Sequence, residues 1–208
     1  FQLSNDFQVT RLLKRYMPED EKSQGYATLL EWKNIFFEPD TNVIRSRKTQ
    51  VRIGAIQWQM REVESVDELL KQVEYFIDAV SDYKSDFVLF PEFFNAPLIG
   101  LSPDQSNQTE AIRFLASFTE RFINEMSQFA VSYNINVITG SMPVIEDEIV
   151  YNVSYLCRRD GTVEEQKKIH ITPHERRDWV IEGGNELRVF NTDAGRVGIL
   201  ICYDVEFP

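Results

Sequence analysis

Two stretches of the chain repeat apolar residues every three or four positions, the period of one face of a helix. The first follows Ser65, where Glu68 three residues later forms a capping-box pattern that predicts the helix start. The second covers 108–133 and is rich in aromatic residues. We interpret both stripes as core-facing. Their members are Val66, Leu69, Leu70, Val73, Phe76, Ile77 and Val80 in the first, and Ile112, Leu115, Phe118, Phe122, Met126, Phe129 and Tyr133 in the second.

Shorter apolar runs with β-branched residues predict strands between and after these helices. They lie at 51–58, 87–90, 135–142, 149–158 and 162–166. The pair Asp160-Gly161 separates the last two runs and is a hairpin signal. Two further runs, 187–191 and 197–201, are predicted to pair with each other. Strands that alternate with helices in this way favour an α/β fold around a mixed sheet.

The first fifty residues differ from the rest, because apolar clusters alternate there with charged residues. They predict two short helices with a loop between them, and fifty residues of this kind are too few for a core of their own. We therefore interpret 1–50 as a helical linker or N-terminal arm and 51–208 as the main domain. The apolar positions of the two helices are Leu12, Leu13 and Tyr16, then Tyr26, Leu29, Leu30 and Phe36.

Three chemically reactive side chains follow predicted strands. Cys202 comes directly after the strand 197–201, on a sharp turn into a helix whose N-terminus would lower the pKa of the thiol. A single cysteine in an apolar strand is more often a core residue than a nucleophile. However, Glu92 and Lys168 also follow strands, and the carboxyl ends of strands are where α/β sheets gather their functional groups.

The motifs around these residues carry a family resemblance. In this order along the chain, Phe90-Pro91-Glu92, Lys168-Ile169-His170 and Ile201-Cys202-Tyr203-Asp204 resemble the Glu-Lys-Cys triad motifs of the nitrilase superfamily, the carbon-nitrogen hydrolases. The resemblance covers about 51–208. It implies a four-layer α-β-β-α sandwich and a homo-oligomer. It also implies that the C-terminal part of the sandwich is missing from these 208 residues, so that the sequence is a fragment.

The N-terminal arm carries a second resemblance. Asn5-Asp6-Phe7 and Gly25-Tyr26-Ala27-Thr28-Leu29-Leu30-Glu31-Trp32 are similar to the connector in bacterial proteins that join an N-acetyltransferase domain to a nitrilase-like domain. No acetyltransferase domain is recognisable in this sequence.

The triad resemblance implies a role for each residue in acyl transfer through a thiol. Cys202 would be the nucleophile and Glu92 the general base. Lys168, with the backbone N–H of Tyr203, would stabilise the oxyanion. A second glutamate of the family corresponds by position to Glu175, which would orient Lys168 and the substrate nitrogen.

Other residues offer alternatives to this triad. His170 and His174 allow a Cys–His pair, but the resemblance gives His170 a structural position and leaves both on a loop. Cys157 lies on the predicted strand 149–158 and is interpreted as core, and Lys167 as a solvated surface residue.

The expected activity is hydrolysis of a non-peptide carbon-nitrogen bond in a small amide or carbamoyl compound, through a thioester on cysteine. Within the family, Tyr-Asp after the cysteine is typical of amidases and carbamoyl hydrolases, whereas true nitrilases tend to carry Trp-Glu. The sequence of this chain is Cys202-Tyr203-Asp204, which favours the amidase side. The alternatives are an acyltransferase on the same scaffold, a nitrilase, and a noncatalytic partner domain.

The amino-acid composition argues against several classes of binding partner. The net charge of −11 argues against a nucleic-acid surface, and no apolar run approaches the roughly 20 residues of a membrane span. The two cysteines allow no disulfide framework and have no metal-ligand spacing, which fits a reducing, cytoplasmic setting. We therefore expect a small-molecule amide as substrate, no metal, no cofactor, no nucleic acid and no membrane.

Overall fold

The computed structural model describes residues 8–13, 27–31, 50–104 and 106–207, which belong to two compact units, 1–46 and 47–208. In the first unit, strand β1 (Gln8–Leu13) pairs antiparallel with β2 (Ala27–Glu31). The helices predicted around Leu12 and Leu29 are therefore wrong at these positions. Segments of five or six residues are too short to show a helical period, and the first contains β-branched Val9 and Thr10. Tyr16, Tyr26 and Phe36 lie outside the described residues.

The second unit is built on a mixed sheet in the order β3-β4-β5-β6-β7. Strands β3 (Ile53–Ala55), β4 (Phe87–Leu89) and β5 (Asn136–Glu146) are parallel, and β6 (Ile149–Cys157) and β7 (Val163–Lys167) continue the sheet antiparallel. The short strand β8 (Ile181–Glu182) pairs parallel with β6. These are the strands predicted between 51 and 166, with β3 shorter and β5 longer than expected.

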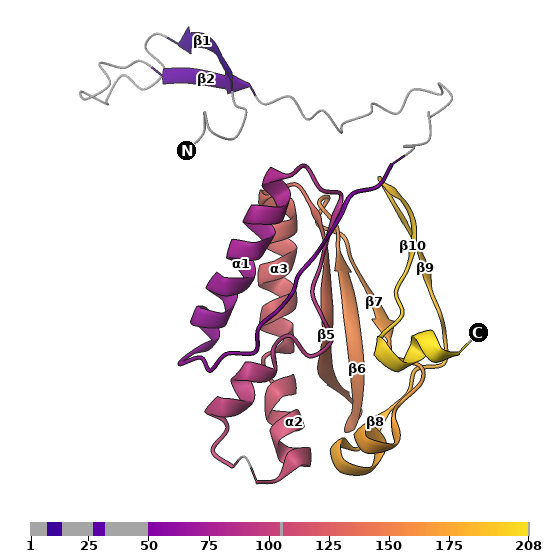
Figure 1. Cartoon of the computed structure of the whole chain (residues 1–208). Coiled ribbons are helices and arrows are strands. Elements are labelled where there is room, and N and C mark those ends of the chain that lie inside the picture. The colour runs from indigo at the N-terminus through magenta and orange to yellow at the C-terminus, as the bar shows by residue number, and fades with distance from the viewer. Residues whose placement is uncertain (1–7, 14–26, 32–49, 105, 208) are drawn as a thin grey trace. The chain divides into compact units, whose positions relative to one another are not determined.

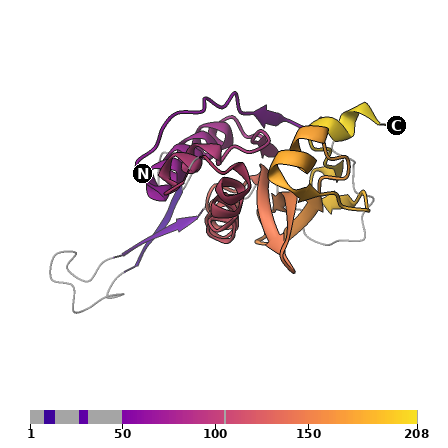
Figure 2. The same cartoon turned by 90° about the horizontal axis from the view of Figure 1, so that it is seen from below.

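Helices cover one face of this sheet (Figures 1 and 2). Helix α1 (Val66–Asp82) begins where predicted, and the Glu68 amide donates to Ser65 Oγ at 3.2 Å. The Glu68 carboxylate accepts from the amide of Glu64 at 2.8 Å, not from that of Ser65. Leu69, Val73 and Ile77 are fully buried, so the apolar stripe is core as expected.

The second predicted helix is two helices, α2 (Gln108–Ala116) and α3 (Thr119–Ser132). The break follows from two hydroxyl groups that bond the backbone. Ser117 Oγ donates to the Phe114 carbonyl at 2.6 Å, an interaction that competes with helix continuation. Thr119 Oγ1 donates to the carbonyl of Pro143 on β5 at 2.7 Å and anchors the start of α3 to the sheet.

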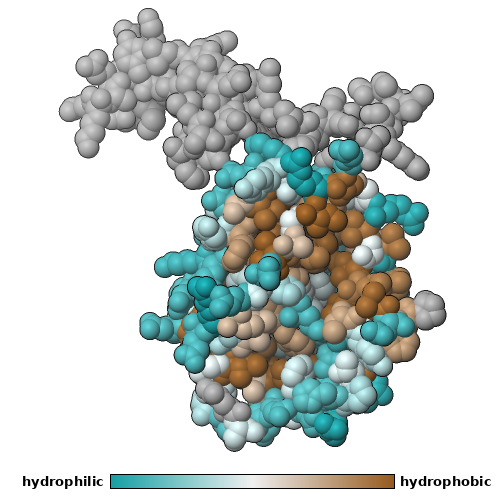
Figure 3. Space-filling model, viewed as in Figure 1, coloured by the Kyte–Doolittle hydropathy of each residue, from teal (hydrophilic) through white to brown (hydrophobic). Residues whose placement is uncertain are grey.

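The hairpin of β9 (Val189–Thr192) and β10 (Gly195–Gly198) lies on the other face of the sheet (Figures 1 and 2). The pairing is as predicted, although the second strand ends at Gly198 and not at 201. A small apolar cluster joins the hairpin region to the sheet; it contains Phe87, Ile138, Leu156, Phe190, Ala194, Ile199 and Ile201. Leu187, Val189 and Leu200 remain exposed on this side, where apolar residues reach the surface (Figure 3).

The fold class is thus the mixed α/β arrangement that the sequence predicted. The larger core cluster lies between the sheet and the helices and includes Phe90 and Phe94, which flank Glu92. The candidate site lies beside this core. Glu92 is next to the sheet, and Lys168 and Cys202 lie on the segments that follow β7 and β10.

Candidate active site

Glu92 is positioned by a bulge in β5. The pairing register of β5 shifts between Ile138 and Ser141, and Gly140 in this gap has a φ of 73°. A Cβ on Gly140 would lie 2.1 Å from the carbonyl oxygen of Pro91, so only glycine lets the Pro91–Glu92 segment approach this closely. Glu92 then forms a β-bridge with Ser141, which fixes its backbone beside the sheet.

Lys168 follows β7 and is 1% exposed. Its amide donates to the carbonyl of Asn152 on β6 at 2.8 Å, and its own carbonyl accepts from the amide of Gly184 at 2.8 Å. Its Nζ lies 2.9 Å from Glu92 Oε1, and 2.7 and 2.8 Å from the two carboxylate oxygens of Glu175. The structure therefore brings Glu92, Lys168 and Glu175 together in one hydrogen-bonded group.

Glu175 opens a π-helical turn, Glu175–Trp179. π-Helical turns are rare in proteins, and those that do occur are often found at functional sites. Thr172 holds the carboxylate through its amide at 2.9 Å and its hydroxyl at 2.7 Å. The Glu175 side chain is 4% exposed, so this glutamate is a buried partner of Lys168. The sequence alone does not show whether a loop glutamate is buried.

Cys202 begins a short 3-10 helix, Cys202–Glu206, and is exposed. Its φ of 48° confirms the predicted sharp turn, but β10 ends at Gly198, so Cys202 does not directly follow the strand as predicted. Buried Asp204 stabilises this turn by accepting from the amide of Ile201 at 3.1 Å and from the amides of Ile169 and His170 at 3.1 and 2.7 Å. One carboxylate therefore ties the cysteine turn to the segment that follows Lys168.

Charge pairing fixes the protonation of the buried ions. Burial by itself lowers the pKa of Lys168, but hydrogen bonds to Glu175 and Glu92 outweigh it and raise this pKa. Burial likewise raises the pKa of Glu175, but bonds from Lys168 and Thr172 outweigh it, so this pKa is lowered. Lys168 is thus a cation and Glu175 an anion at neutral pH.

The expected lowering of the Cys202 pKa is wrong. Partial burial raises this pKa, and the hydrogen bond and negative charge of Glu92 raise it further, while Lys168 opposes them. The helix that follows has only five residues, and two carboxylates accompany the one lysine nearby. The thiol of Cys202 is therefore protonated at neutral pH.

The histidines have other partners. His170 Nδ1 lies 3.1 Å from Asp204 Oδ1, and the ring stacks on Phe207 with centroids 3.9 Å apart. His174 Nδ1 lies 2.6 Å from Asp178 Oδ2. These contacts give His170 the structural position that the resemblance implied.

The remaining side chains near the motifs are also placed by the structure. Cys157 is buried in the core, as expected. Lys167 pairs with Glu146 at 2.5 Å and is not simply solvated.

Two polar residues of this region have roles that the sequence does not predict. Asn152 Nδ2 donates to Glu92 Oε1 at 2.9 Å, but an asparagine within a strand pattern carries no signal of its own. Asp204 was noted only as part of the cysteine motif. Its role in joining two loops depends on contacts 34 and 35 residues apart, which sequence spacing does not show.

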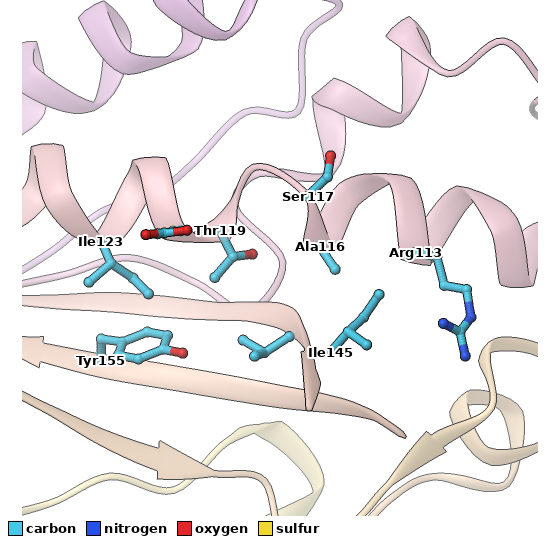
Figure 4. Close-up of a pocket in the computed structure, with 9 residues that line it drawn as sticks. Arg113, Ala116, Ser117, Thr119, Ile123, Ile145 and Tyr155 are labelled. Carbon is cyan, nitrogen blue, oxygen red and sulfur yellow. The ribbon is translucent and has the colours of Figure 1, made fainter. Parts of the chain in front are cut away.

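A cavity of about 400 Å³ lies elsewhere, between the α2–α3 junction and strands β5 and β6 (Figure 4). Its wall includes Arg113, Thr119 and Tyr155, and none of the four candidate residues. Within the described part of the chain, no group of acidic, histidine and cysteine side chains could hold a metal ion. Nor does that part contain a helix long and apolar enough to cross a membrane.

Comparison with known proteins identifies the family. The carbon-nitrogen hydrolase family model matches residues 52–208. The chain is 44% identical to the probable hydrolase YhcX of Bacillus subtilis, covering all of this chain and 40% of that protein. It is 27% identical to the 2-oxoglutaramate amidase of B. subtilis, covering 68% of this chain and 51% of that protein. The chain thus spans about half, or less, of the length of these relatives.

Solved structures agree on the fold. Nit3 of Saccharomyces cerevisiae, a member of the nitrilase superfamily, superposes with a TM-score of 0.62 at 21% identity, covering 76% of this chain and 57% of that one. An amidase from Nesterenkonia also superposes with a TM-score of 0.62, at 20% identity, covering 81% of this chain and 61% of that one. With the family model matching 52–208, these findings show that the chain belongs to the carbon-nitrogen hydrolase family.

Proposed function

We propose that this protein hydrolyses the carbon-nitrogen bond of a small amide or carbamoyl compound through a thioester on Cys202. The observation that carries the proposal is the position of the Glu92 carboxylate. It accepts a hydrogen bond from the fixed cation Lys168 at 2.9 Å, and it is near enough to Cys202 to raise the pKa of that thiol. A base, a cation and a nucleophile gathered in one site are the groups that acyl transfer through a thiol requires.

Acylation begins when Cys202 Sγ attacks the carbonyl carbon while Glu92 takes the thiol proton. This transfer is required because the raised pKa of Cys202 keeps the thiol protonated before attack. Glu92 then gives the proton to the nitrogen of the tetrahedral intermediate. The carbon-nitrogen bond breaks, ammonia or an amine leaves, and the thioester remains.

In deacylation, water attacks the thioester carbon and Glu92 accepts a proton from the water. That proton passes to the departing Cys202 sulfur, and a carboxylic acid is released. The cation of Lys168 and the backbone N–H of Tyr203 stabilise the oxyanion in both steps. Glu175 keeps Lys168 in place, because it bonds the ammonium group with both carboxylate oxygens.

The similarity to proteins named as amidases supports an amide substrate. The Tyr203-Asp204 pair after the cysteine points in the same direction. The match to YhcX covers all of this chain, so it includes the first fifty residues as well as the carbon-nitrogen hydrolase region.

A screen of small amides and carbamoyl compounds, each beside its matched nitrile, tests the proposal. We expect intact-mass spectrometry to detect the acyl group on the protein, and release of ammonia or amine with a first-turnover burst. Cys202→Ala should abolish both signals, while Cys157→Ala serves as the matched cysteine control. Faster conversion of nitriles than of every amide, by kcat/KM, contradicts the proposal. So does transfer of the acyl group to an added amine in place of water.

A further inference from the structure

Asn152 contacts both Glu92 and Lys168 from one position on β6. Its side chain donates from Nδ2 to Glu92 Oε1 at 2.9 Å, and its backbone carbonyl accepts from the amide of Lys168 at 2.8 Å. The residue is fully buried in the middle of the sheet. Sheet strands are the most rigid part of the fold, so Asn152 provides a fixed reference for the Glu92 carboxylate.

The two donors that reach Glu92 from the sheet side share one of its oxygens. Both Asn152 Nδ2 and Lys168 Nζ lie 2.9 Å from Oε1. The Oδ1 atom of Asn152 is buried and has no hydrogen-bond partner within the described part of the chain. Reversing the amide would turn that oxygen toward the carboxylate, where two acceptors repel each other, so the charge of Glu92 sets the amide orientation.

We propose that Asn152 is a positioning residue that fixes the rotation of the Glu92 carboxylate. With Oε1 occupied by two donors, Oε2 is presented to the Cys202 thiol as the proton acceptor. This inference rests on the proposed function, in which Glu92 is the general base. Without Asn152 the carboxylate rotates about its last bond, and the acceptor oxygen is no longer aligned with the sulfur.

The hydrogen bond also affects when Glu92 is charged, because a donor to a carboxylate favours its ionised form. Among the described residues, the titratable groups that face Glu92 are Lys168 after β7, Cys202 at the start of its short helix, and Glu175 beyond the lysine. All three are retained when only Asn152 is changed. A shift in pH dependence on changing Asn152 therefore reports the lost donor.

The test uses Asn152→Ala, which removes the amide, and Asn152→Asp, which keeps its shape but replaces the donor with an acceptor. Ser154→Ala is the matched control, because Ser154 lies two residues further along β6, is equally buried and has an unpartnered hydroxyl. Iodoacetamide alkylation of Cys202 is followed against pH for each variant. This readout needs no knowledge of the substrate.

Because iodoacetamide reacts with the thiolate, the acidic limb of the alkylation profile follows the ionisation of Cys202. This limb should move to higher pH by about 0.5 unit or more in Asn152→Ala, because the Glu92 carboxylate has then lost one donor and holds the thiol proton more strongly. The shift should be larger in Asn152→Asp and absent in Ser154→Ala. With an amide that the wild type hydrolyses, kcat should fall about ten- to hundredfold while KM changes little. In a Glu92→Gln background, replacing Asn152 should produce no further shift.

An unmoved acidic limb in both Asn152 variants, with only a lower melting temperature, overturns the inference. An equal shift in Ser154→Ala also overturns it. A different outcome separates the two proposals. If none of the tested amides acylates the wild-type protein, but the acidic limb of the alkylation profile still moves in the Asn152 variants, the proposed function fails and the coupling of Asn152 to Glu92 stands.

Discussion

At the scale of single residues, backbone strain collects around the candidate site. Seven described non-glycine residues have positive φ angles, and four of these lie at helix ends or in the β5–β6 turn. The other three are Phe93, which follows Glu92, Val180, which ends the π-helical turn of Glu175, and Cys202 itself. Such conformations cost of order 1 kcal/mol each and persist where surrounding packing imposes them. The backbone at Cys202 is therefore held in its turn by the surrounding structure.

The two cysteines differ enough to predict their reactivity. Burial raises the pKa of Cys157 to about 12, and its side chain is inaccessible, whereas Cys202 is exposed. We expect iodoacetamide to modify Cys202 alone in the folded protein. The rate should rise with pH because the thiolate is the nucleophile, and the raised pKa of Cys202 moves this rise to higher pH. Peptide mapping before and after denaturation checks this. Labelling of Cys157 first in the folded protein would contradict the assignment of Cys202 as the reactive thiol.

At the scale of elements, hydrophobic periodicity predicted those helices and strands that bury one regular face. The stripe of α1 and the strands from β4 to β7 were recovered because each buries one regular face. The break between α2 and α3 was not, since it depends on Ser117 and Thr119 bonding backbone carbonyls, one of them on β5. The β1–β2 pair was predicted as helix because its segments are too short for periodicity to separate the two structures.

The β5 bulge yields a prediction with an internal control. Gly140 and Gly161 both have positive φ, but a Cβ on Gly161 would meet nothing nearer than 3.8 Å. Gly161→Ala should therefore cost about 1 kcal/mol of unfolding free energy and leave activity unchanged. Gly140→Ala adds a clash with the Pro91 carbonyl, so it should cost more and also lower kcat/KM by displacing Glu92. Chemical denaturation and amide turnover measure the two effects, and equal behaviour of the two variants would refute this role of the bulge.

At the scale of the whole molecule, the candidate site is an assembly of distant segments. Sequence order and motif resemblance predicted Glu92, Lys168, Glu175 and Cys202, because each follows a strand or a motif. The hydrogen bond of Lys168 to Glu92 spans 76 residues, and no local pattern gives its geometry. Asn152 and the linking role of Asp204 could not be predicted, since buried hydrogen bonds between loops and sheet depend on the completed fold. The predicted lowering of the Cys202 pKa was wrong for the same reason, because the burial of the thiol and the nearby carboxylates depend on the completed fold.

The buried ion group also links the site to global stability. Replacing Glu175 with glutamine leaves Lys168 with one carboxylate in a buried position, and this should lower the unfolding free energy by roughly 3 kcal/mol at neutral pH. The folded-state pKa of Glu175 is lowered from 4.5. Its contribution is therefore complete above about pH 4.5 and is lost as pH falls through the lower folded value.

The difference in unfolding free energy between wild type and Glu175→Gln should consequently narrow as the pH falls below 4.5. Denaturant titrations at several pH values measure it. Glu182→Gln on β8 is the control, since that glutamate is exposed and should give a small, constant difference. A wild type–Glu175→Gln difference that stays constant down to pH 3 would mean that Glu175 is not held ionised by Lys168. In that case the lysine would lack the fixed anion that keeps its charge beside Glu92.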